Sequence, residues 1–136
     1  LGYGRLQQAG GGTVKLGLEF SGVDRISGRR ICGVSNQGCM ATKLFTPEQL
    51  LWEIPEHIST QAACTLPVVY ATVYYALVCK ANIQPGQVVL IHSIAGGVGQ
   101  AAYHVCTHRG CTNWDMLSRK ETVGTRTPWV TIRSYI

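Results

Sequence analysis

The most regular pattern of hydrophobic and polar positions lies in the second half of the chain. Pro85-Gly86 predicts a tight turn, and the unbroken apolar run at residues 88–91 (VVLI) is typical of a strand covered on both faces of a parallel sheet. From Val98 onward, apolar residues recur at the spacing of one helical face, and Gly110 is a suitable residue to follow the end of a helix. The pattern predicts a buried strand, a short turn of small residues and a helix.

The first 59 residues have a different pattern, with short apolar runs separated by glycine-containing turns. Residues 13–20 predict a strand, residues 21–28 a turn with charged tips, and residues 29–34 the returning strand of a hairpin. Residues 41–45 and 51–54 are further strand candidates, the second ended by Pro55. This part of the chain therefore predicts small β-strands and no long helix.

Residues 60–82 connect the two parts and are mostly apolar. Ser59 or Thr60 can cap a short helical turn, and Pro67 is expected to end or kink that turn. The run from Val68 (VVYATVYYALVCKAN) is apolar almost all round, which predicts a helix buried between two layers or two domains. We therefore divide the chain at residues 1–59, 60–82 and 83–136.

The turn after the predicted strand reads HSIAGGVGQAA, residues 92–102. Gly96 and Gly99 occupy the second and third positions of a dinucleotide-binding fingerprint, with Gly97 as an additional residue without a side chain. The backbone N–H groups of Gly97, Val98 and Gly99 are the predicted phosphate donors, because the start of a helix favours a bound anion. Ile94 stands at the first fingerprint position, where a β-branched residue is unfavourable if φ must be positive, so we expect a strained or reshaped turn.

Composition and charge exclude several other classes of protein. The chain has 136 residues, a net charge of +5, 46% hydrophobic and 14% charged residues, and its basic residues are scattered, which disfavours nucleic-acid binding. We expect no stretch long enough to cross a bilayer, no secretory signal, and hence a cytoplasmic location with six reduced cysteines. The first residue, Leu1, is not methionine, so we expect a chain cut from a longer one.

The sequence resembles the enoyl-reductase domain of animal-type fatty acid synthase, a zinc-free branch of the medium-chain dehydrogenase/reductase superfamily. The resemblance covers roughly residues 14–111 and is carried by the stretches GLEFSG (17–22), GRRICGV (28–34), WEIPEH (52–57), AACTLPVVYATVYYALV (62–78) and IQPGQVVLIHSIAGGVGQAA (83–102). It implies an α/β chain: a partial, GroES-like, β-rich substrate domain followed by the start of a Rossmann dinucleotide-binding domain.

The resemblance also implies chemistry and partners. NADPH would deliver hydride to a trans-2-enoyl thioester on acyl carrier protein, in fatty acid biosynthesis, within a dimeric, multifunctional synthase and without a membrane. Zinc-dependent relatives have a histidine where this chain has Leu18, so no metal is expected. Thr72 matches a threonine of the family that could approach the nicotinamide, whereas no residue is assigned as the catalytic proton donor.

After Cys111 the match to that family is lost, and three interpretations of the tail remain open. Residues 113–117 read as a degraded strand that leaves Ser118, Arg119 and Lys120 to bind the 2′-phosphate of NADPH. Alternatively, residues 122–125 form the family's phosphate turn, with Arg126 nearby. In the third interpretation, Asp115 holds the ribose 2′-hydroxyl as in NAD enzymes.

Two other functions remain open. A quinone oxidoreductase-like reductase has the same fold, and a catalytically dead, truncated relative keeps the fold without binding a nucleotide. The divergent residues 112–136 and Ile94 favour the dead relative.

Overall fold

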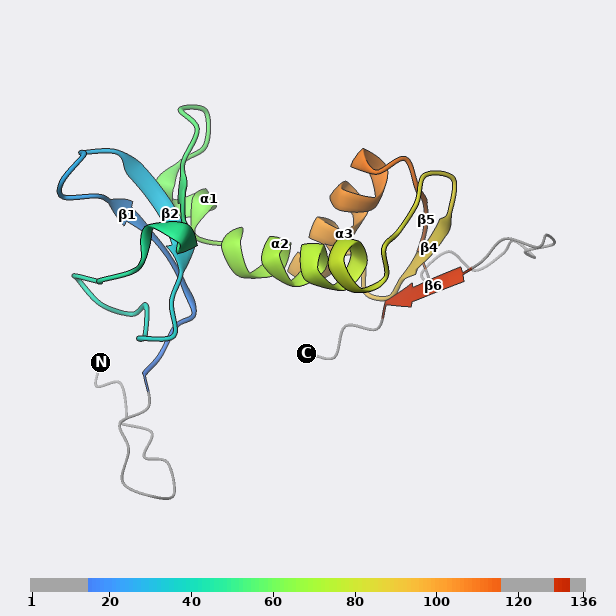
Figure 1. The fold of residues 1–136 in the computed structure, drawn as a ribbon, viewed down its shortest axis with the longest axis horizontal. Coiled ribbons are helices and arrows are strands. Elements are labelled where there is room, and N and C mark those ends of the chain that lie inside the picture. The colour runs from blue at the N-terminus through green and yellow to red at the C-terminus, as the bar shows by residue number, and fades with distance from the viewer. Residues whose placement is uncertain (1–14, 116–128, 133–136) are drawn as a thin grey trace, which may run out of the picture. The chain divides into compact units, whose positions relative to one another are not determined.

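The computed structural model describes residues 15–115 and 129–132 (Figure 1). The described residues form two compact units, divided between Val68 and Val69. Each unit has its own small sheet and its own hydrophobic core.

The first unit contains a three-stranded antiparallel sheet. Strands β1 (Glu19–Val23), β2 (Arg30–Val34) and β3 (Leu51–Glu53) lie in the order β1-β2-β3, and the short 3-10 helix η1 (Glu48–Leu50) leads into β3. Its core consists of three small or medium side chains, with Ile58 packed against them: Cys32, Ile54 and Ala63. The predicted hairpin and the strand candidate at residues 51–54 are thus confirmed.

The hairpin differs from the prediction in its boundaries. Residues 21–23, assigned to the turn, belong to β1, and the turn begins at Asp24. The reason is local, because the Asp24 carboxylate accepts hydrogen bonds from the N–H groups of Ile26 and Ser27, both at 3.1 Å. The strand candidate at residues 41–45 is wrong: Ala41 donates its N–H to the carbonyl of Cys39 two residues earlier, in a local turn.

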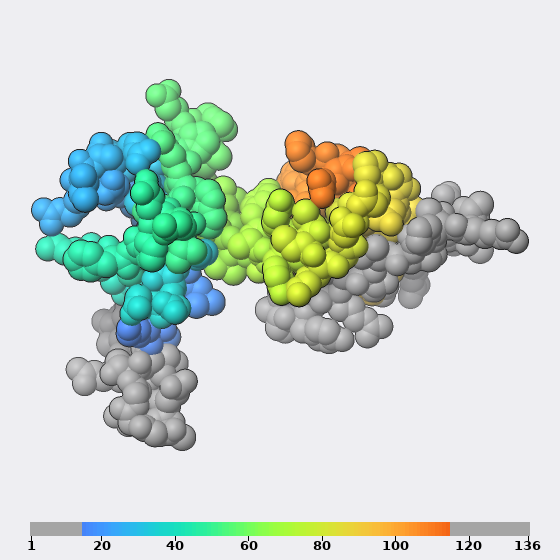
Figure 2. Space-filling model, in the orientation of Figure 1, coloured from blue at the N-terminus to red at the C-terminus, as the bar shows by residue number. Residues whose placement is uncertain are grey.

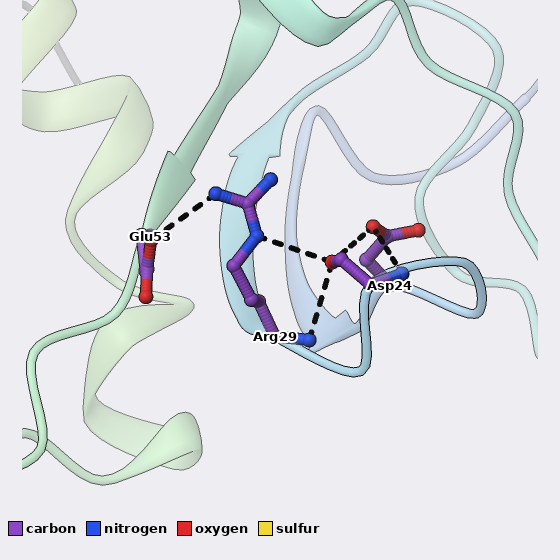
Figure 3. A network of polar contacts seen from close by, with 4 residues as sticks. Asp24, Arg29 and Glu53 are labelled. Atoms are coloured by element: carbon purple, nitrogen blue, oxygen red, sulfur yellow. Dashed lines mark hydrogen bonds and ion pairs between the residues drawn. The ribbon is translucent and has the colours of Figure 1, made fainter.

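Polar side chains join this turn to the neighbouring strand (Figure 3). The Ser27 hydroxyl donates to Asp24 and accepts from Nε of Arg29 at 3.1 Å, while the Arg29 guanidinium lies 3.3 Å from the Glu53 carboxylate. The hydrogen bond from Ser27, with the two backbone N–H groups, holds the pKa of Asp24 below its usual range. Both members of the Arg29–Glu53 pair are exposed, so this ion pair contributes at most about 1 kcal/mol.

A short helix, α1 (Thr60–Ala63), follows in the first unit. The Ser59 hydroxyl accepts the N–H of Ala62 at 3.1 Å, which confirms the predicted cap. Pro67 does not end this helix; it is instead the first residue of α2 (Pro67–Val73), a position where its missing N–H is not required. The Glu19 carboxylate accepts the N–H of Val68 at 2.9 Å and so satisfies a donor in the first turn of α2.

The second unit contains a parallel sheet. It consists of β4 (Val88–Ile91), β5 (Thr112–Asp115) and β6 (Trp129–Ile132) in the order β5-β4-β6, with α3 (Gly97–His108) connecting β4 to β5. The predicted strand and helix are confirmed, and β5 agrees with a strand near residue 113. Strand β6 was not predicted.

The α2 helix continues as a π-helical segment, η2 (Tyr74–Lys80). Val73 and Leu77 are buried in the core of the second unit, but three tyrosines of this helix are between 37% and 58% exposed: Tyr70, Tyr74 and Tyr75. The prediction of a buried helix is therefore wrong for these three side chains. Figure 2 shows atoms of the segment that holds this helix, in yellow-green, at the surface. Strand β4 is likewise covered more fully on the face of Val89 and Ile91 than on the other.

Length and composition alone would allow the helical stretch Thr60–Lys80 to cross a membrane, contrary to the expectation from the sequence. It has 21 residues, and 22% of its most apolar window is buried in the structure. A core helix of a soluble protein passes the same test, so this finding is weak evidence for a membrane span.

Candidate functional site

The candidate site is the turn between β4 and α3. The strand ends at Ile91, the N–H of Gly96 donates to the carbonyl of Ser93 at 3.0 Å, and the Gly96 carbonyl accepts the N–H of Gln100 at 2.8 Å as α3 begins. The carboxamide of Gln100 also donates to the carbonyl of Ala95 at 2.7 Å, which ties the turn to the first turn of the helix.

The backbone strain in this turn falls one residue before the position that we expected. Among the described residues other than glycine, only Asn82 and Ser93 have positive φ, and that of Ser93 is 58°. Ile94 instead packs its half-buried side chain against the core of the second unit. The turn is thus reshaped so that Ser93 adopts the left-handed conformation, and no clear sequence signal identifies a serine for that conformation.

The glycines of the turn have two different structural roles. A Cβ on Gly99 would lie 2.4 Å from the Ser93 carbonyl oxygen and 2.6 Å from Cα of Ile94, so the packing of helix against turn requires glycine there. A Cβ on Gly96 or Gly97 would meet its nearest neighbour at 3.4 Å, and neither residue has a positive φ. The protein's own packing therefore explains Gly99, and the N-cap position, where glycine is common, accounts for Gly96. Neither reason applies to Gly97.

The residues predicted to donate to a phosphate lie at the start of α3. Gly96 is the N-cap residue and has no side chain with which to cap the helix. Gly97, Val98 and Gly99 precede Gln100, whose N–H makes the bond to the Gly96 carbonyl. Because the first N–H groups of a helix have no partner within the helix, this end favours an anion.

Thr72 lies on α2, which packs against the start of α3. Val69, one helical turn before Thr72, places its Cγ1 3.4 Å from the Cβ position of Gly97, a contact that the sequence analysis did not foresee. The side chain of Thr72 is exposed, and its approach to a nicotinamide stays a prediction.

The residues proposed for the 2′-phosphate lie outside the described residues: Ser118, Arg119 and Lys120, and in the alternative alignment residues 122–125 with Arg126.

The thiols of Cys106 and Cys111 lie in the hydrophobic core of the second unit. Burial raises the pKa of the Cys106 thiol to about 11, with nearby Cys111 adding to the effect, and burial also raises the pKa of Cys111. Within residues 15–115 and 129–132, no group of three or more histidine, cysteine, aspartate or glutamate residues is arranged to hold a metal ion.

No family model matches the chain, but it has similar relatives of known description. It is 41% identical over 104 residues to quinone oxidoreductase-like protein 2 of Rattus norvegicus, a match that covers 70% of this chain and 30% of the rat protein. It is 39% identical over 127 residues to the reducing polyketide synthase rdc5 of Metacordyceps chlamydosporia, covering 93% of this chain and 5% of the synthase. The chain thus spans less than a third of the length of these relatives.

The match to the polyketide synthase bears on the tail of the chain. It leaves out about nine of the 136 residues, so it includes most of residues 112–136. Similarity to this relative therefore extends into the segment where the resemblance to fatty acid synthase was lost.

Solved structures show the same two kinds of neighbour. The CurK enoyl reductase has a TM-score of 0.68 and 31% identity, covering 75% of this chain and 33% of that one. The quinone oxidoreductase of Thermus thermophilus, solved alone and in complex with NADPH, has a TM-score of 0.65 and 33% identity, covering 72% and 32%. These neighbours confirm the predicted α/β fold class, a partial GroES-like domain followed by the start of a Rossmann dinucleotide-binding domain.

Proposed function

We propose that this chain carries the nucleotide-binding turn and part of the substrate domain of an NADPH-dependent enoyl reductase of the medium-chain dehydrogenase/reductase superfamily. Its relatives and structural neighbours are enoyl reductases, reducing polyketide synthases and quinone oxidoreductases. The parent protein that we propose is a synthase of the reducing polyketide type, because this chain is similar to a reducing polyketide synthase. Animal fatty acid synthase stays a prediction of the sequence analysis.

The observation that carries the proposal is Gly97, the first residue of α3. Glycine within a helix costs up to about 1 kcal/mol relative to alanine, and neither packing nor φ requires it at Gly97. A ligand that must approach the backbone closely supplies the missing reason. The N–H groups of Gly97, Val98 and Gly99 would then bind the pyrophosphate, and Thr72 would lie beside the nicotinamide.

When bound, NADPH supplies the hydride for an activated carbon–carbon double bond. In the proposed reaction, the main-chain donors hold and orient the nucleotide, and the substrate is an enoyl thioester attached to acyl carrier protein. The other domains of a multifunctional, dimeric synthase are the proposed partners. No described residue is assigned the proton transfer to the α-carbon.

A quinone oxidoreductase-like activity is the second candidate, and the match to the rat protein supports it. An assay with NADPH and either a crotonyl thioester or a small quinone distinguishes the two, since consumption of NADPH with the thioester alone supports the enoyl reductase. Consumption with the quinone alone supports the other candidate.

Nucleotide binding tests the proposal without requiring turnover. Titration of NADPH, followed by its own fluorescence, is expected to give a Kd below about 1 mM, which corresponds to about −4 kcal/mol. Absence of binding at that concentration would refute the proposal and favour the catalytically dead relative.

A further inference from the structure

The C-terminal end of α3 brings two cysteines together. The helix ends at His108, Gly110 has a φ of 72°, and the chain then enters β5 (Figure 1). The N–H of Gly110 donates to the carbonyl of Thr107 at 3.0 Å, and that of Cys111 donates to the carbonyl of Cys106 at 2.9 Å. These two hydrogen bonds define a Schellman motif, in which the side chains at the positions of Cys106 and Cys111 commonly contact each other.

The hydrogen bond limits the distance between the backbones of the two cysteines. The path between their Cα atoms follows the Cys106 carbonyl, the 2.9 Å hydrogen bond and the N–Cα bond of Cys111. This path would be about 7 Å long if it were straight, and the bend at the carbonyl carbon makes the Cα atoms lie closer than that. Disulfides join Cα atoms that are about 4.4–6.8 Å apart, so the backbone meets the distance requirement of a disulfide.

The two thiols also share one environment. Both lie in the core of the second unit, where Cys106 is fully buried and Cys111 is 9% exposed. After burial, the electrostatic interaction with Cys111 is the second cause of the raised pKa of Cys106, which requires the two thiols to be near each other. The Cys111 thiol donates a weak hydrogen bond to the Gln84 carbonyl at 3.3 Å, and a disulfide would replace that bond.

We propose that Cys106 and Cys111 are a disulfide-forming pair, oxidised by small-molecule disulfides such as oxidised glutathione. The thiolate of Cys111, the more exposed of the two, attacks a sulfur of the glutathione disulfide, and one glutathione leaves as a thiolate. The thiolate of Cys106 then attacks Sγ of Cys111 and expels the second glutathione. The two protein thiols lose two electrons and two protons, and two glutathione thiols form.

The disulfide would close a ring over residues 106–111 and hold the last turn of α3 to the residue before β5. Because the folded chain already brings the two cysteines together, the fold and the disulfide should stabilise each other. The inference does not depend on the proposed function, since the pair lies at the opposite end of α3 from the glycine turn.

The position of Arg109 gives a direct assay. Trypsin cleaves after Arg109, between the two cysteines, and releases residues 81–109 and 110–119 as two peptides with one cysteine each. Only a disulfide between Cys106 and Cys111 links these peptides to each other. The full chain is equilibrated in glutathione redox buffers, with and without guanidinium chloride, and free thiols are then blocked in acidic denaturant. Mass spectrometry measures the fraction of linked peptides.

The equilibrium constant for forming the disulfide is expected to be on the order of tenfold larger in native buffer than in guanidinium chloride. Using equilibrium constants avoids the slow oxidation that burial imposes. Cys79→Ser removes an exposed cysteine outside the pair and should leave both constants unchanged. Cys106→Ala should abolish the linked peptides and leave glutathione attached to Cys111.

Two results would overturn the inference. One is the absence of linked peptides from the unmodified chain in native buffer, at every ratio of oxidised to reduced glutathione. The other is an equilibrium constant in native buffer equal to or smaller than that in guanidinium chloride, because the folded geometry would then not favour the disulfide.

Discussion

Replacing Gly99 and Gly97 by alanine, one at a time, separates the two structural roles of glycine in the turn. At Gly99 the added Cβ would lie 2.4 Å, 2.6 Å and 2.9 Å from three backbone atoms of Ser93 and Ile94. Ordinary contacts between carbon atoms are about 3.5–4.0 Å long, so α3 must move away from the turn by about 1 Å. Backbone atoms cannot rotate out of the way as the end of a side chain can.

The expected cost of this movement follows from known overpacking effects. Forcing an extra carbon into a packed site costs about 1–3 kcal/mol, and the better helix propensity of alanine returns up to about 1 kcal/mol. Because three backbone contacts are too short, we take the upper end of the overpacking range, about 3 kcal/mol, less the gain in propensity of about 1 kcal/mol. We therefore expect Gly99→Ala to destabilise the second unit by about 2 kcal/mol. The equilibrium constant for local opening of α3 is then expected to rise about thirtyfold.

Gly97→Ala is the matched variant. Its Cβ would lie 3.4 Å from Cγ1 of Val69, an ordinary contact with the end of a side chain, so the helix should be as stable as before or slightly more stable. If Gly97 is glycine because a phosphate approaches it, the Kd for NADPH should rise at least about tenfold, or about 1.4 kcal/mol.

Hydrogen exchange measured by mass spectrometry on peptides from α3 provides the stability readout, and NADPH fluorescence provides the Kd. Exchange in Gly99→Ala at the rate of the unmodified chain would refute the packing argument. Unchanged NADPH binding by Gly97→Ala, with α3 equally protected, would refute the assignment of Gly97 to the ligand.

Three further predictions concern other parts of the chain. A maleimide should label exposed Cys79 quickly and Cys106 only on unfolding, because Cys106 is buried and its pKa is about 11; equal labelling rates in the folded chain would contradict this. Glu19→Ala removes the acceptor of the Val68 N–H. Losing this cap should cost about 1 kcal/mol and speed hydrogen exchange at the start of α2 about fivefold. Glu19→Gln keeps an acceptor oxygen and should change the exchange rate less. The pKa of Asp24 is lowered in the folded chain. The contribution of this carboxylate to stability is therefore complete above its unfolded pKa of about 3.9 and is lost as the pH falls through the lower folded value. A midpoint at or above about 3.9 in an NMR titration of this carboxyl group would show that the turn does not hold the carboxylate.

The sequence by itself determined the elements whose signals are local. The apolar run at residues 88–91 became β4, the turn at Gly86 has a φ of 82°, and Gly110 has a φ of 72° after α3. Each depends on the conformational preference of a few consecutive residues, so a pattern read along the chain is sufficient. The strand–turn–helix unit and its candidate phosphate donors could be predicted for that reason.

Only the tertiary structure decided which contacts those elements make. It showed that Gly99 is required by the approach of α3 to the turn, that Ser93 rather than Ile94 has the left-handed conformation, and that β6 pairs with β4 from a distant part of the chain. It also showed that Tyr74 is exposed on a helix whose composition predicted burial. These features depend on which surfaces meet across long separations in sequence, and hydrophobicity along the chain does not record that.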